Sequence, residues 1–554
     1  MRLVVVGGVA GGMSAAARAR RLSEDAEIIV LESRGEVSFA NCGLPYFVGG
    51  EIEDKEQLLV HTPASLSASL GLDVRVNTDV VAIDTKNRVI TLSDSDGTSE
   101  LSYDELILSP GASAIRPPIP GLDSPRVHTL RTVPDAVGLK AAVEGARTAV
   151  VMGAGFIGLE AAEAMQMQGL RTAVVELAPH VLPPLETEMA QLVRDELVRL
   201  GIAIHDGVSA IAVEQGEDHD VVVLSDGTRL DADIIVLSVG VSPDTRVWEE
   251  AGVTCDRGAI LIDELGRTAV EHTWAVGDAT ASADLVTGAR RPVALAGPAN
   301  RSGRLVADAI MGKRGHVLPG LAGTAIVRVG ALTAALTGAN RRSLDEAGVE
   351  YHTIHLHPLN HAGYFPGATQ IHLMMHFKTD GRVLGAQAVG NDGVDKRIDV
   401  LAVAIKAGFT VHDLMDLDLA YSPPYGSAKD PVNMAGMMGC NVLDGTLKLW
   451  HAEDVEDVVA SSLVLDVRSA AEVADGHLAG SLNVPHIELR DRMEEVRAAA
   501  NGRPVSVLCA SGVRSYLALR QLDHAGLHAT NLSGGMLTFR AALGARANTF
   551  ITTG

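Results

Sequence analysis

Cysteine is scarce in this chain, and so are aromatic residues, which make up 3% of it. Four cysteines are spread over 554 residues without a CxxC pair: Cys42, Cys255, Cys440 and Cys509. This spacing argues against a disulfide framework and against a cysteine-based zinc site, and we predict no metal site. Each cysteine or tyrosine inside a motif is therefore more informative than usual.

Basic residues and long apolar runs are also in short supply. The chain has 46 Lys and Arg against 69 Asp and Glu, a net charge of −23. Nucleic acids bind to basic faces, so we expect no nucleic acid partner. No apolar run reaches the roughly 18 residues that a membrane span requires, and the first residues lack the pattern of a signal peptide. We expect a cytoplasmic protein with no membrane partner.

Two segments share one design. "RLVVVGGVAGGMSAAARARRL", from Arg2, and "TAVVMGAGFIGLEAAEAMQMQG", from Thr148, each combine a short apolar strand, a glycine turn and an alanine-rich helix. Each is followed by a second strand that ends at an acid, Glu32 or Glu176. The glycines let the backbone approach a pyrophosphate, the helix start offers free N–H groups, and the acid accepts hydrogen bonds from ribose. The chain, at about three to five domains long, thus contains two dinucleotide folds.

The residues of these turns are the predicted cofactor contacts. In the first turn the middle glycine position is occupied by Val9, whereas the second turn is a full match. A carboxylate at Glu176, with no arginine in the following "LAPH", favours NADH over NADPH, although NADPH stays open. Two further strand ends are expected to hold a flavin. The predicted contacts are Gly7, Val9, Ala10, Gly11, Gly12, Glu32, Ser33, Gly111, Gly277 and Asp278 for the flavin, and Gly153, Gly155, Phe156, Ile157, Gly158 and Glu176 for the nicotinamide coenzyme.

The order of these motifs, together with "SFANCGLPY" around Cys42 and "AVGDA" at residues 275–279, resembles the pyridine nucleotide–disulfide oxidoreductases. The single cysteine resembles the branch that includes coenzyme A-disulfide reductases, NADH oxidases and peroxidases. The last hundred residues, with "LDVRSAAEVADGHLAGSLNVP" and "CASGVRS", resemble a rhodanese domain. The whole chain is similar to coenzyme A-disulfide reductase–rhodanese fusions, also described as NADH-dependent persulfide reductases.

The resemblance implies an α/β protein with the following domains: an FAD-binding domain in two parts (1–113 and 246–322), an NAD(P)H-binding domain (114–245), an α+β dimerisation domain (323–445) and an α/β rhodanese domain (446–554). It implies that Cys42 lies over the flavin and forms a mixed disulfide with its ligand, and the reactive thiolate leads us to expect a lowered pKa for Cys42. The implied coenzyme A contacts are Ser14, Arg18, Arg21, Ser38, Asn41, Asn300 and Lys429. Tyr364 and Tyr421 are implied to reach the active site from the partner subunit of a homodimer.

The rhodanese-like tail carries its own candidate nucleophile. The N–H groups that follow Cys509 can curl around a thiolate or persulfide, and Arg514 is expected to bind an anionic sulfur donor. Asp466 and Arg468 are expected to be structural. Dual-specificity phosphatases have a similar but longer loop, so the length of Cys509–Arg514 favours a sulfurtransferase.

The sequence therefore predicts an NADH-dependent flavoprotein, with FAD and coenzyme A as its other ligands. Its predicted substrates are coenzyme A disulfide and coenzyme A or other low-molecular-weight persulfides or polysulfides. The alternatives are an NADH oxidase or peroxidase that cycles Cys42 through sulfenic acid, and a non-enzymatic sensor of sulfane sulfur.

Overall fold

The computed structural model describes residues 1–313 and 316–553, which form two compact units. Unit 1 consists of Met1–Pro179 and Val198–Gly323, and unit 2 consists of His180–Leu197 and Thr324–Gly554. The segment from His180 to Leu197 thus groups with unit 2, although it lies inside the range predicted for the NAD(P)H-binding domain. The proposed domain boundaries all stay predictions.

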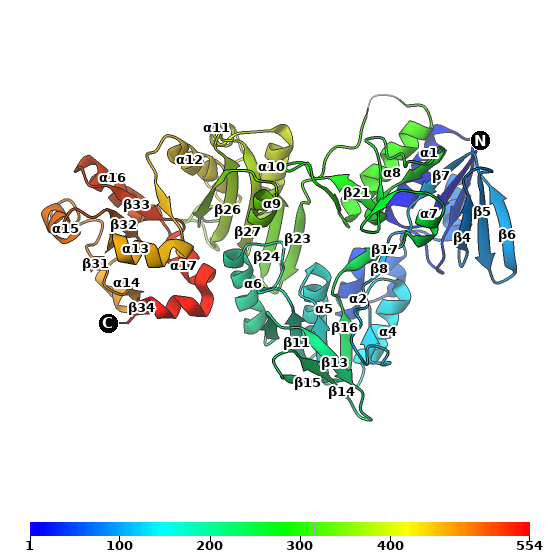
Figure 1. Cartoon of the computed structure of the whole chain (residues 1–554), viewed down its shortest axis with the longest axis horizontal. Coiled ribbons are helices and arrows are strands. Elements are labelled where there is room, and N and C mark those ends of the chain that lie inside the picture. The colour runs from blue at the N-terminus through cyan, green and yellow to red at the C-terminus, as the bar shows by residue number, and fades with distance from the viewer. Residues whose placement is uncertain (314–315, 554) are drawn as a thin grey trace. The chain divides into compact units, whose positions relative to one another are not determined.

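The first sheet of unit 1 is wholly parallel, in the order β20-β7-β1-β2-β3. Its strands are β1 (Arg2–Val6), β2 (Glu27–Leu31), β3 (Asp73–Arg75), β7 (Glu105–Leu108) and β20 (Thr273–Ala275). The apolar run of β1 is buried almost throughout, as expected for a strand covered on both faces. Helices α1 (Ala10–Leu22) and α8 (Ala296–Ile310) pack side by side (Figure 1).

The second sheet of unit 1 repeats this plan in the order β12-β11-β10-β16-β9. Its parallel strands are β9 (Val127–His128), β10 (Thr148–Met152), β11 (Arg171–Glu176), β12 (Ala203–Asp206) and β16 (Ile234–Leu237). Helix α5 (Phe156–Met167) follows β10 directly and packs on this sheet. Both predicted dinucleotide turns therefore lie at the carboxyl ends of parallel strands, where such ligands bind.

Smaller elements complete unit 1. Its meanders and ribbons are β4 (Asp79–Asp84), β5 (Val89–Asp94) and β6 (Gly97–Ser102); β13 (Ala210–Glu214), β14 (Asp220–Leu224) and β15 (Arg229–Ala232); β8 (Ala112–Ala114) with β17 (Val241–Pro243); and β18 (Cys255–Asp256), β19 (Ala259–Leu261), β21 (Thr280–Ala283) and β22 (Arg290–Pro292). Its shorter helices are η1 (Asn41–Gly43), α2 (Leu44–Val48), η2 (Lys55–Leu58), α3 (Pro63–Leu70), α4 (Val133–Val143), α7 (Arg246–Glu250) and η3 (Gly277–Ala279).

Unit 2 begins its main part with an antiparallel sheet in the order β23-β24-β27-β26-β25. The strands are β23 (Ala325–Val329), β24 (Leu332–Gly338), β25 (Tyr351–Leu356), β26 (Ile371–Lys378) and β27 (Val383–Gly390). The helices are α6 (Thr187–Arg199), α9 (Arg341–Glu346), α10 (Val394–Ala407), α11 (Val411–Met415) and α12 (Pro431–Leu443). This arrangement is the α+β architecture that the sequence predicts.

The last part of unit 2 is built on a parallel sheet in the order β28-β33-β32-β29-β31. Its strands are β28 (Leu449–Trp450), β29 (Leu463–Asp466), β31 (Leu482–Asn483), β32 (Val505–Leu508) and β33 (Ala529–Leu532), with a ribbon of β30 (His477–Leu478) and β34 (Ile551–Thr552). The helices are η4 (Ala452–Asp454), α13 (Val455–Ser461), α14 (Ala470–Ala474), α15 (Met493–Ala500), α16 (Val513–His524), α17 (Gly535–Leu543) and η5 (Gly544–Thr549). In Figure 1 these elements carry the orange and red end of the colour scale.

No helix within 1–313 or 316–553 has the length and apolar character needed to cross a membrane. The same residues contain no group of three or more His, Cys, Asp or Glu side chains that could hold a metal ion.

Candidate functional site

The first glycine turn brings α1 into close contact with the end of β1. Gly7 has a φ of 100°, and a Cβ there would lie 1.9 Å from the carbonyl oxygen of Ser109. A Cβ on Gly12 would lie 1.9 Å from the carbonyl oxygen of Gly7. These two positions therefore require glycine. Val9 is the N-cap of α1 with a φ of −113°, a value open to any residue, which explains why the middle position tolerates valine.

Glu32 lies at the end of β2 and faces this turn. Its buried carboxylate accepts a hydrogen bond of 2.8 Å from the Gly8 N–H and one of 3.1 Å from the Arg34 N–H. Ser33 beside it is exposed. The turn, the helix start and the carboxylate fit the adenosine and pyrophosphate half of FAD.

The second turn has the same geometry around Gly153 and Gly158. A Cβ on Gly158 would lie 2.0 Å from the carbonyl oxygen of Gly153. Glu176, at the end of β11, accepts from the Ala154 N–H at 2.6 Å and from the Ala178 N–H at 2.8 Å. The remaining predicted contacts begin α5, with Gly155 as its N-cap, Phe156 as its first residue and an exposed Ile157. The residues present fit a dinucleotide with free ribose hydroxyls.

Ser109, which follows β7, lies close to three of the predicted flavin contacts: Gly7, Gly11 and Gly277. A Cβ on Gly11 would lie 3.1 Å from the Ser109 Oγ, and one on Gly277 would lie 3.5 Å from it. Asp278 follows Gly277, and burial raises the pKa of its carboxyl group. A close approach also marks Gly111, whose Cβ would lie 2.9 Å from a guanidinium nitrogen of Arg131.

Arg131 is a candidate cofactor residue that the sequence reasoning missed. Its Nε is buried and has no hydrogen-bond partner among the described residues. Burial and then the nearby Arg34 guanidinium lower the pKa of Arg131. Two cationic groups beside an unpartnered buried N–H form a site for an anion such as a pyrophosphate. No sequence motif marks this role, because Arg131 lies outside both glycine turns and meets Gly111 only in the fold.

Cys42 lies in η1, on a segment joined to the flavin turn. The N–H of Ser38 donates a hydrogen bond of 2.8 Å to the carbonyl oxygen of Gly8. Cys42 and Asn41 are both exposed, so a substrate can reach them. The expected lowering of the Cys42 pKa is wrong for this arrangement of residues. Partial burial raises it, and the carboxylates of Glu160 and Asp278 raise it further.

The implied coenzyme A contacts of unit 1 gather on α1 and α8. Ser14 donates a hydrogen bond to the side-chain oxygen of Asn300. Arg18 is paired with Asp308 at 2.6 Å, whereas Arg21 is exposed. The structure therefore brings Ser14 and Asn300 together, and it gives Arg18 a carboxylate partner that the sequence reasoning did not foresee.

Tyr364 and Tyr421 lie on two neighbouring loops of unit 2. Their side chains are 77% and 48% exposed, and their hydroxyl groups are 3.1 Å apart. The hydrogen bond to Tyr421 raises the pKa of Tyr364. Buried Arg397 supports both loops, because it donates to the Asn360 carbonyl oxygen at 2.9 Å and pairs with Asp430 at 2.8 Å.

Lys429 precedes Asp430 and is exposed. It belongs to unit 2, whereas the other implied coenzyme A contacts belong to unit 1.

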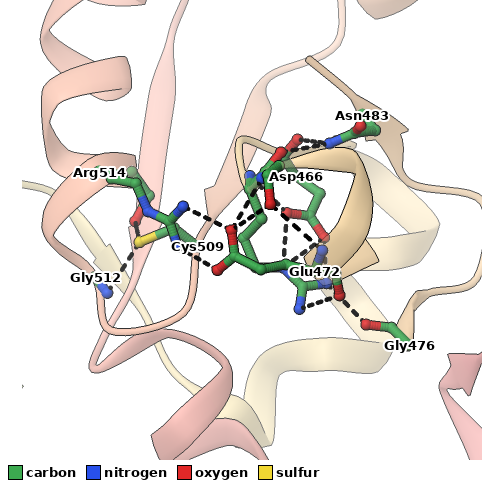
Figure 2. A network of polar contacts seen from close by, with 10 residues as sticks. Asp466, Glu472, Gly476, Asn483, Cys509, Gly512 and Arg514 are labelled. Carbon is green, nitrogen blue, oxygen red and sulfur yellow. Dashed lines mark hydrogen bonds and ion pairs between the residues drawn. The ribbon is translucent and has the colours of Figure 1, made fainter. Parts of the chain in front are cut away.

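Cys509 lies at the start of a tight loop after β32, in the part of unit 2 shown in Figure 2. Its Sγ accepts hydrogen bonds of 3.2 Å from the Gly512 N–H and of 3.2 Å from the Ser515 hydroxyl, and the residue is 1% exposed. These donors stabilise a thiolate or a persulfide. One backbone N–H of the predicted cradle, that of Gly512, thus reaches Sγ, and the Ser515 hydroxyl adds a donor that the sequence reasoning did not name.

The guanidinium of Arg514, which is expected to bind an anionic sulfur donor, is already paired with a carboxylate. Both of its terminal nitrogens pair with Glu472, at 2.5 and 2.8 Å, and this pairing lowers the pKa of Glu472 to about 2. Asp466 and Arg468 form a second, buried pair at 2.6 Å, consistent with their expected structural role. Figure 2 shows Glu472 between Arg514 and Asp466.

Three segments of the chain match known protein families. Residues 1–298 match "Pyridine nucleotide-disulphide oxidoreductase", residues 324–431 match its dimerisation domain, and residues 447–542 match "Rhodanese-like domain". A coenzyme A disulfide reductase of Staphylococcus haemolyticus is 34% identical over 441 residues, which are 78% of this chain and 98% of that protein.

Two solved structures are similar along almost their whole length. The reduced CoADR-RHD protein of Bacillus anthracis is 40% identical with a TM-score of 0.96, and the match covers 98% of each chain. An NAD-dependent persulfide reductase from A. fulgidus is 36% identical with a TM-score of 0.91, covering 97% of this chain and 100% of that one.

The predicted fold class and the predicted FAD-dependent, nicotinamide-linked enzyme class are confirmed by these matches. The chain belongs to the pyridine nucleotide-disulphide oxidoreductase family and carries a rhodanese-like domain after its dimerisation domain.

Proposed function

We propose that this chain is an NADH-dependent flavoprotein that reduces coenzyme A disulfide and coenzyme A or other low-molecular-weight persulfides or polysulfides. The observation that carries this proposal is the position of Cys42, an exposed thiol on a segment bonded directly to the flavin turn through Ser38. Cys255, the other cysteine of unit 1, packs against a hydrophobic core, and burial raises its pKa to about 11. Cys42 is therefore the one thiol of unit 1 that is proposed to react, and the second sulfur of the redox pair belongs to the ligand.

The cofactors have separate places in unit 1. The turn around Gly7 and Gly12, with Glu32, Asp278 and Arg131, would hold FAD, and the turn around Gly153 and Gly158 would hold NADH. Bound FAD would supply two-electron transfer between NADH and sulfur. The Glu176 carboxylate is held by two backbone N–H groups at the end of β11, where it would accept ribose hydroxyls and repel an added phosphate.

Cys42 acts as the nucleophile. Its thiolate attacks a disulfide R–S–S–R, so that a Cys42–S–S–R bond forms and RS⁻ leaves. Two electrons then cleave this mixed disulfide, and protonation gives RSH and free Cys42. With a persulfide R–S–SH the same two electrons and two protons give RSH and H₂S in total. The disulfide and persulfide substrates predicted from the sequence agree with the names of the similar proteins, a coenzyme A disulfide reductase and a persulfide reductase.

Coenzyme A is proposed to lie along α1 and α8. Arg18 and Arg21 would meet its phosphates, Ser14 and Asn300 its polar groups, and Ser38 and Asn41 would flank the sulfur. Arg18 must then share its guanidinium between Asp308 and a phosphate.

We propose that the protein is a homodimer whose active site is shared between subunits. The dimerisation domain at residues 324–431 supports this assembly. Tyr364, Tyr421 and Lys429 are exposed on unit 2 and are the residues proposed to reach the partner's Cys42 site. The tyrosine hydroxyls would donate protons or hydrogen bonds to the leaving thiolate.

The rhodanese-like domain is proposed to supply sulfane sulfur. Cys509 would carry it as a persulfide, held by the Gly512 N–H and the Ser515 hydroxyl. Arg514, paired with Glu472, orders the loop and would bind an anionic donor only by sharing that carboxylate.

An anaerobic NADH oxidation assay tests this function. The purified flavoprotein is offered coenzyme A disulfide or coenzyme A persulfide while NADH and sulfide are followed. Turnover with either substrate supports a reductase, and sulfide release identifies the persulfide as a substrate. If NADH is consumed only after oxygen or hydrogen peroxide is added, the protein is an oxidase or peroxidase instead. Stable modification of Cys42 without turnover would point to a sensor.

A further inference from the structure

The turn Ser533–Gly535 lies directly beneath the Cys509 loop. The carbonyl oxygen of Cys509 accepts a hydrogen bond of 2.9 Å from the Met536 N–H, and that of Ala510 accepts one of 3.0 Å from the Leu537 N–H. A Cβ on Gly535 would lie 2.5 Å from the Cys509 carbonyl oxygen. These contacts fix the distance between the turn and the loop that holds the Cys509 sulfur.

The same turn is pressed against the antiparallel sheet of unit 2. A Cβ on Gly534 would lie 2.8 Å from the Cβ of His355, near the end of β25. The Nδ1 of His355 and the Oγ of Ser533 are 2.8 Å apart. The Nε2 of His357 lies 3.0 Å from the Gly534 carbonyl oxygen and 3.0 Å from the Thr538 Oγ1. Neither glycine has room for a methyl group, so β25, the turn and the Cys509 loop are in direct contact here.

His355 is itself held from the other side. Its Nε2 lies 2.7 Å from a carboxylate oxygen of Glu188 on α6, and Arg341 pairs with the same oxygen at 2.6 Å. The hydrogen bonds and charges of His355 and Arg341 outweigh burial and lower the pKa of Glu188, so the carboxylate is ionised and accepts a hydrogen bond from the Nε2–H of His355. With the N–H at Nε2 facing Glu188, the Nδ1 of His355 accepts a hydrogen bond from the Ser533 hydroxyl. In Figure 1, α6 and α17 lie side by side, and residues of both line one small cavity.

This Glu188–His355–Ser533 chain has the order of groups found in serine hydrolases, but it is closed to substrates. Ser533 is 1% exposed, and the cavity beside His355 has a volume of about 10 Å³. That volume is close to the space of one water molecule. The chain is therefore a support and not a second catalytic centre.

We propose that His355 and His357 are positioning residues for sulfur transfer at Cys509, acting through the Ser533–Gly535 turn. The dimerisation domain would then form part of the rhodanese active site, and Glu188 would complete the support. Only the kinetic test of this inference rests on the proposed sulfurtransferase role of Cys509. The labelling test does not depend on that role.

The first test compares Ser533→Ala with Ser506→Ala in the full-length protein. Ser506 is also buried in this domain, but its hydroxyl bonds to Thr530 and not to the dimerisation domain. We expect Ser533→Ala to lower kcat/KM for thiosulfate-to-cyanide transfer roughly tenfold, because small displacements of a reacting group are costly. Ser506→Ala should stay within about twofold of the wild type.

A second readout does not require turnover. Iodoacetamide labelling of Cys509, followed by mass spectrometry of its peptide over a pH series, reports the pH at which the thiolate forms. We expect Ser533→Ala to raise this midpoint by about one pH unit, since the Gly512 and Ser515 donors move away from Sγ. Ser506→Ala should leave it in place.

The variants His357→Gln and His357→Leu separate positioning from packing, and they decide the matter if Ser533→Ala fails to fold. Glutamine keeps an N–H donor toward Gly534, so it should retain activity within about threefold, whereas leucine should lose roughly tenfold. Equal losses of activity in the two variants would mean that His357 acts through packing alone.

Folded Ser533→Ala and His357→Leu proteins with wild-type labelling midpoints and transfer rates would overturn the proposal. If the wild type transfers no sulfur, the proposed role of Cys509 is wrong, and the labelling midpoints still test the positioning.

Discussion

The hydroxyl groups of Tyr364 and Tyr421 are 3.1 Å apart and open to solvent, although 57 residues separate them in the sequence. Two loops braced by Arg397 hold this pair in place. A paired, exposed set of phenols is suited to donate to a developing thiolate on another surface, and this suggests the first prediction.

Tyr364→Phe and Tyr421→Phe should each reduce the turnover of coenzyme A disulfide by about 10- to 100-fold, because a proton donor to the leaving thiolate is lost. FAD content should not change. Steady-state NADH oxidation measures the effect. Tyr425→Phe, on an equally exposed tyrosine nearby, is the matched control. Wild-type rates in both variants would contradict a role for the pair.

Cys42→Ser should abolish reduction of every disulfide and persulfide, because no other thiol of unit 1 can take its place. The variant should still bind FAD, which the visible spectrum shows. Cys255→Ser is the control and should keep most of the activity, since that thiol packs against a core. Measurable NADH-dependent turnover in Cys42→Ser would remove the central claim.

Glu176→Gln should weaken the preference for NADH over NADPH by about tenfold in the ratio of kcat/KM values, because it removes a charge that repels a phosphate. Glutamine keeps an oxygen for the Ala154 N–H, so the turn should stay intact. The exposed Glu217→Gln removes the same charge elsewhere on this nucleotide domain and should not change the ratio. An unchanged ratio in Glu176→Gln would refute the assignment.

Cys509→Ser should leave reduction of coenzyme A disulfide unchanged and should impair the use of thiosulfate or other sulfane donors. The reason is that the two thiols serve separate reactions. Parallel assays of both substrates on one preparation give the comparison. A matching fall in both activities would show that the two-site division is wrong.

Low pH should loosen the contact between the two parts of unit 2. Burial lowers the pKa of four histidines there, His357 and His451 to about 3 and His372 and His376 in the same direction. In the unfolded chain a histidine binds a proton near pH 6.5, so below this pH the unfolded state binds more protons and folding stability falls. Each histidine contributes up to about 1.4 kcal/mol per pH unit in the window below 6.5.

Hydrogen exchange of β25 and α17 at pH 7.5 and 5.5, corrected for intrinsic rates, measures this loss. His451→Gln removes one of the four groups and should reduce the pH dependence. Equal protection at both pH values would contradict the prediction.

The parts of the site that could be predicted from the sequence depend on local geometry. Gly7 and Gly12, or Gly153 and Gly158, are close in sequence and meet because strand, turn and helix follow one another. The loop after Cys509 is local in the same sense. Each motif determines its own backbone conformation. Both nucleotide folds and the rhodanese-like loop could therefore be predicted from the sequence.

The parts that could not be predicted depend on distant contacts. Arg18 meets Asp308 across 290 residues, and His355 meets Ser533 across 178. Arg514 finds Glu472 across 42 residues, so its side chain is already engaged. The direction of the Cys42 pKa depends on Glu160 and Asp278, which no local pattern places beside it.

The position of β20 bears on how the chain is made. Thr273–Ala275 pairs with β7, whose sequence ends at Leu108, so the first sheet is completed only after the entire second nucleotide fold has been synthesised. During translation the edge of β7 stays open, and an open strand edge invites wrong pairing. The inserted fold, which has all of its own strands, can close first. The flavin half is therefore able to assemble only after β20 and α8, which packs on α1, have left the ribosome.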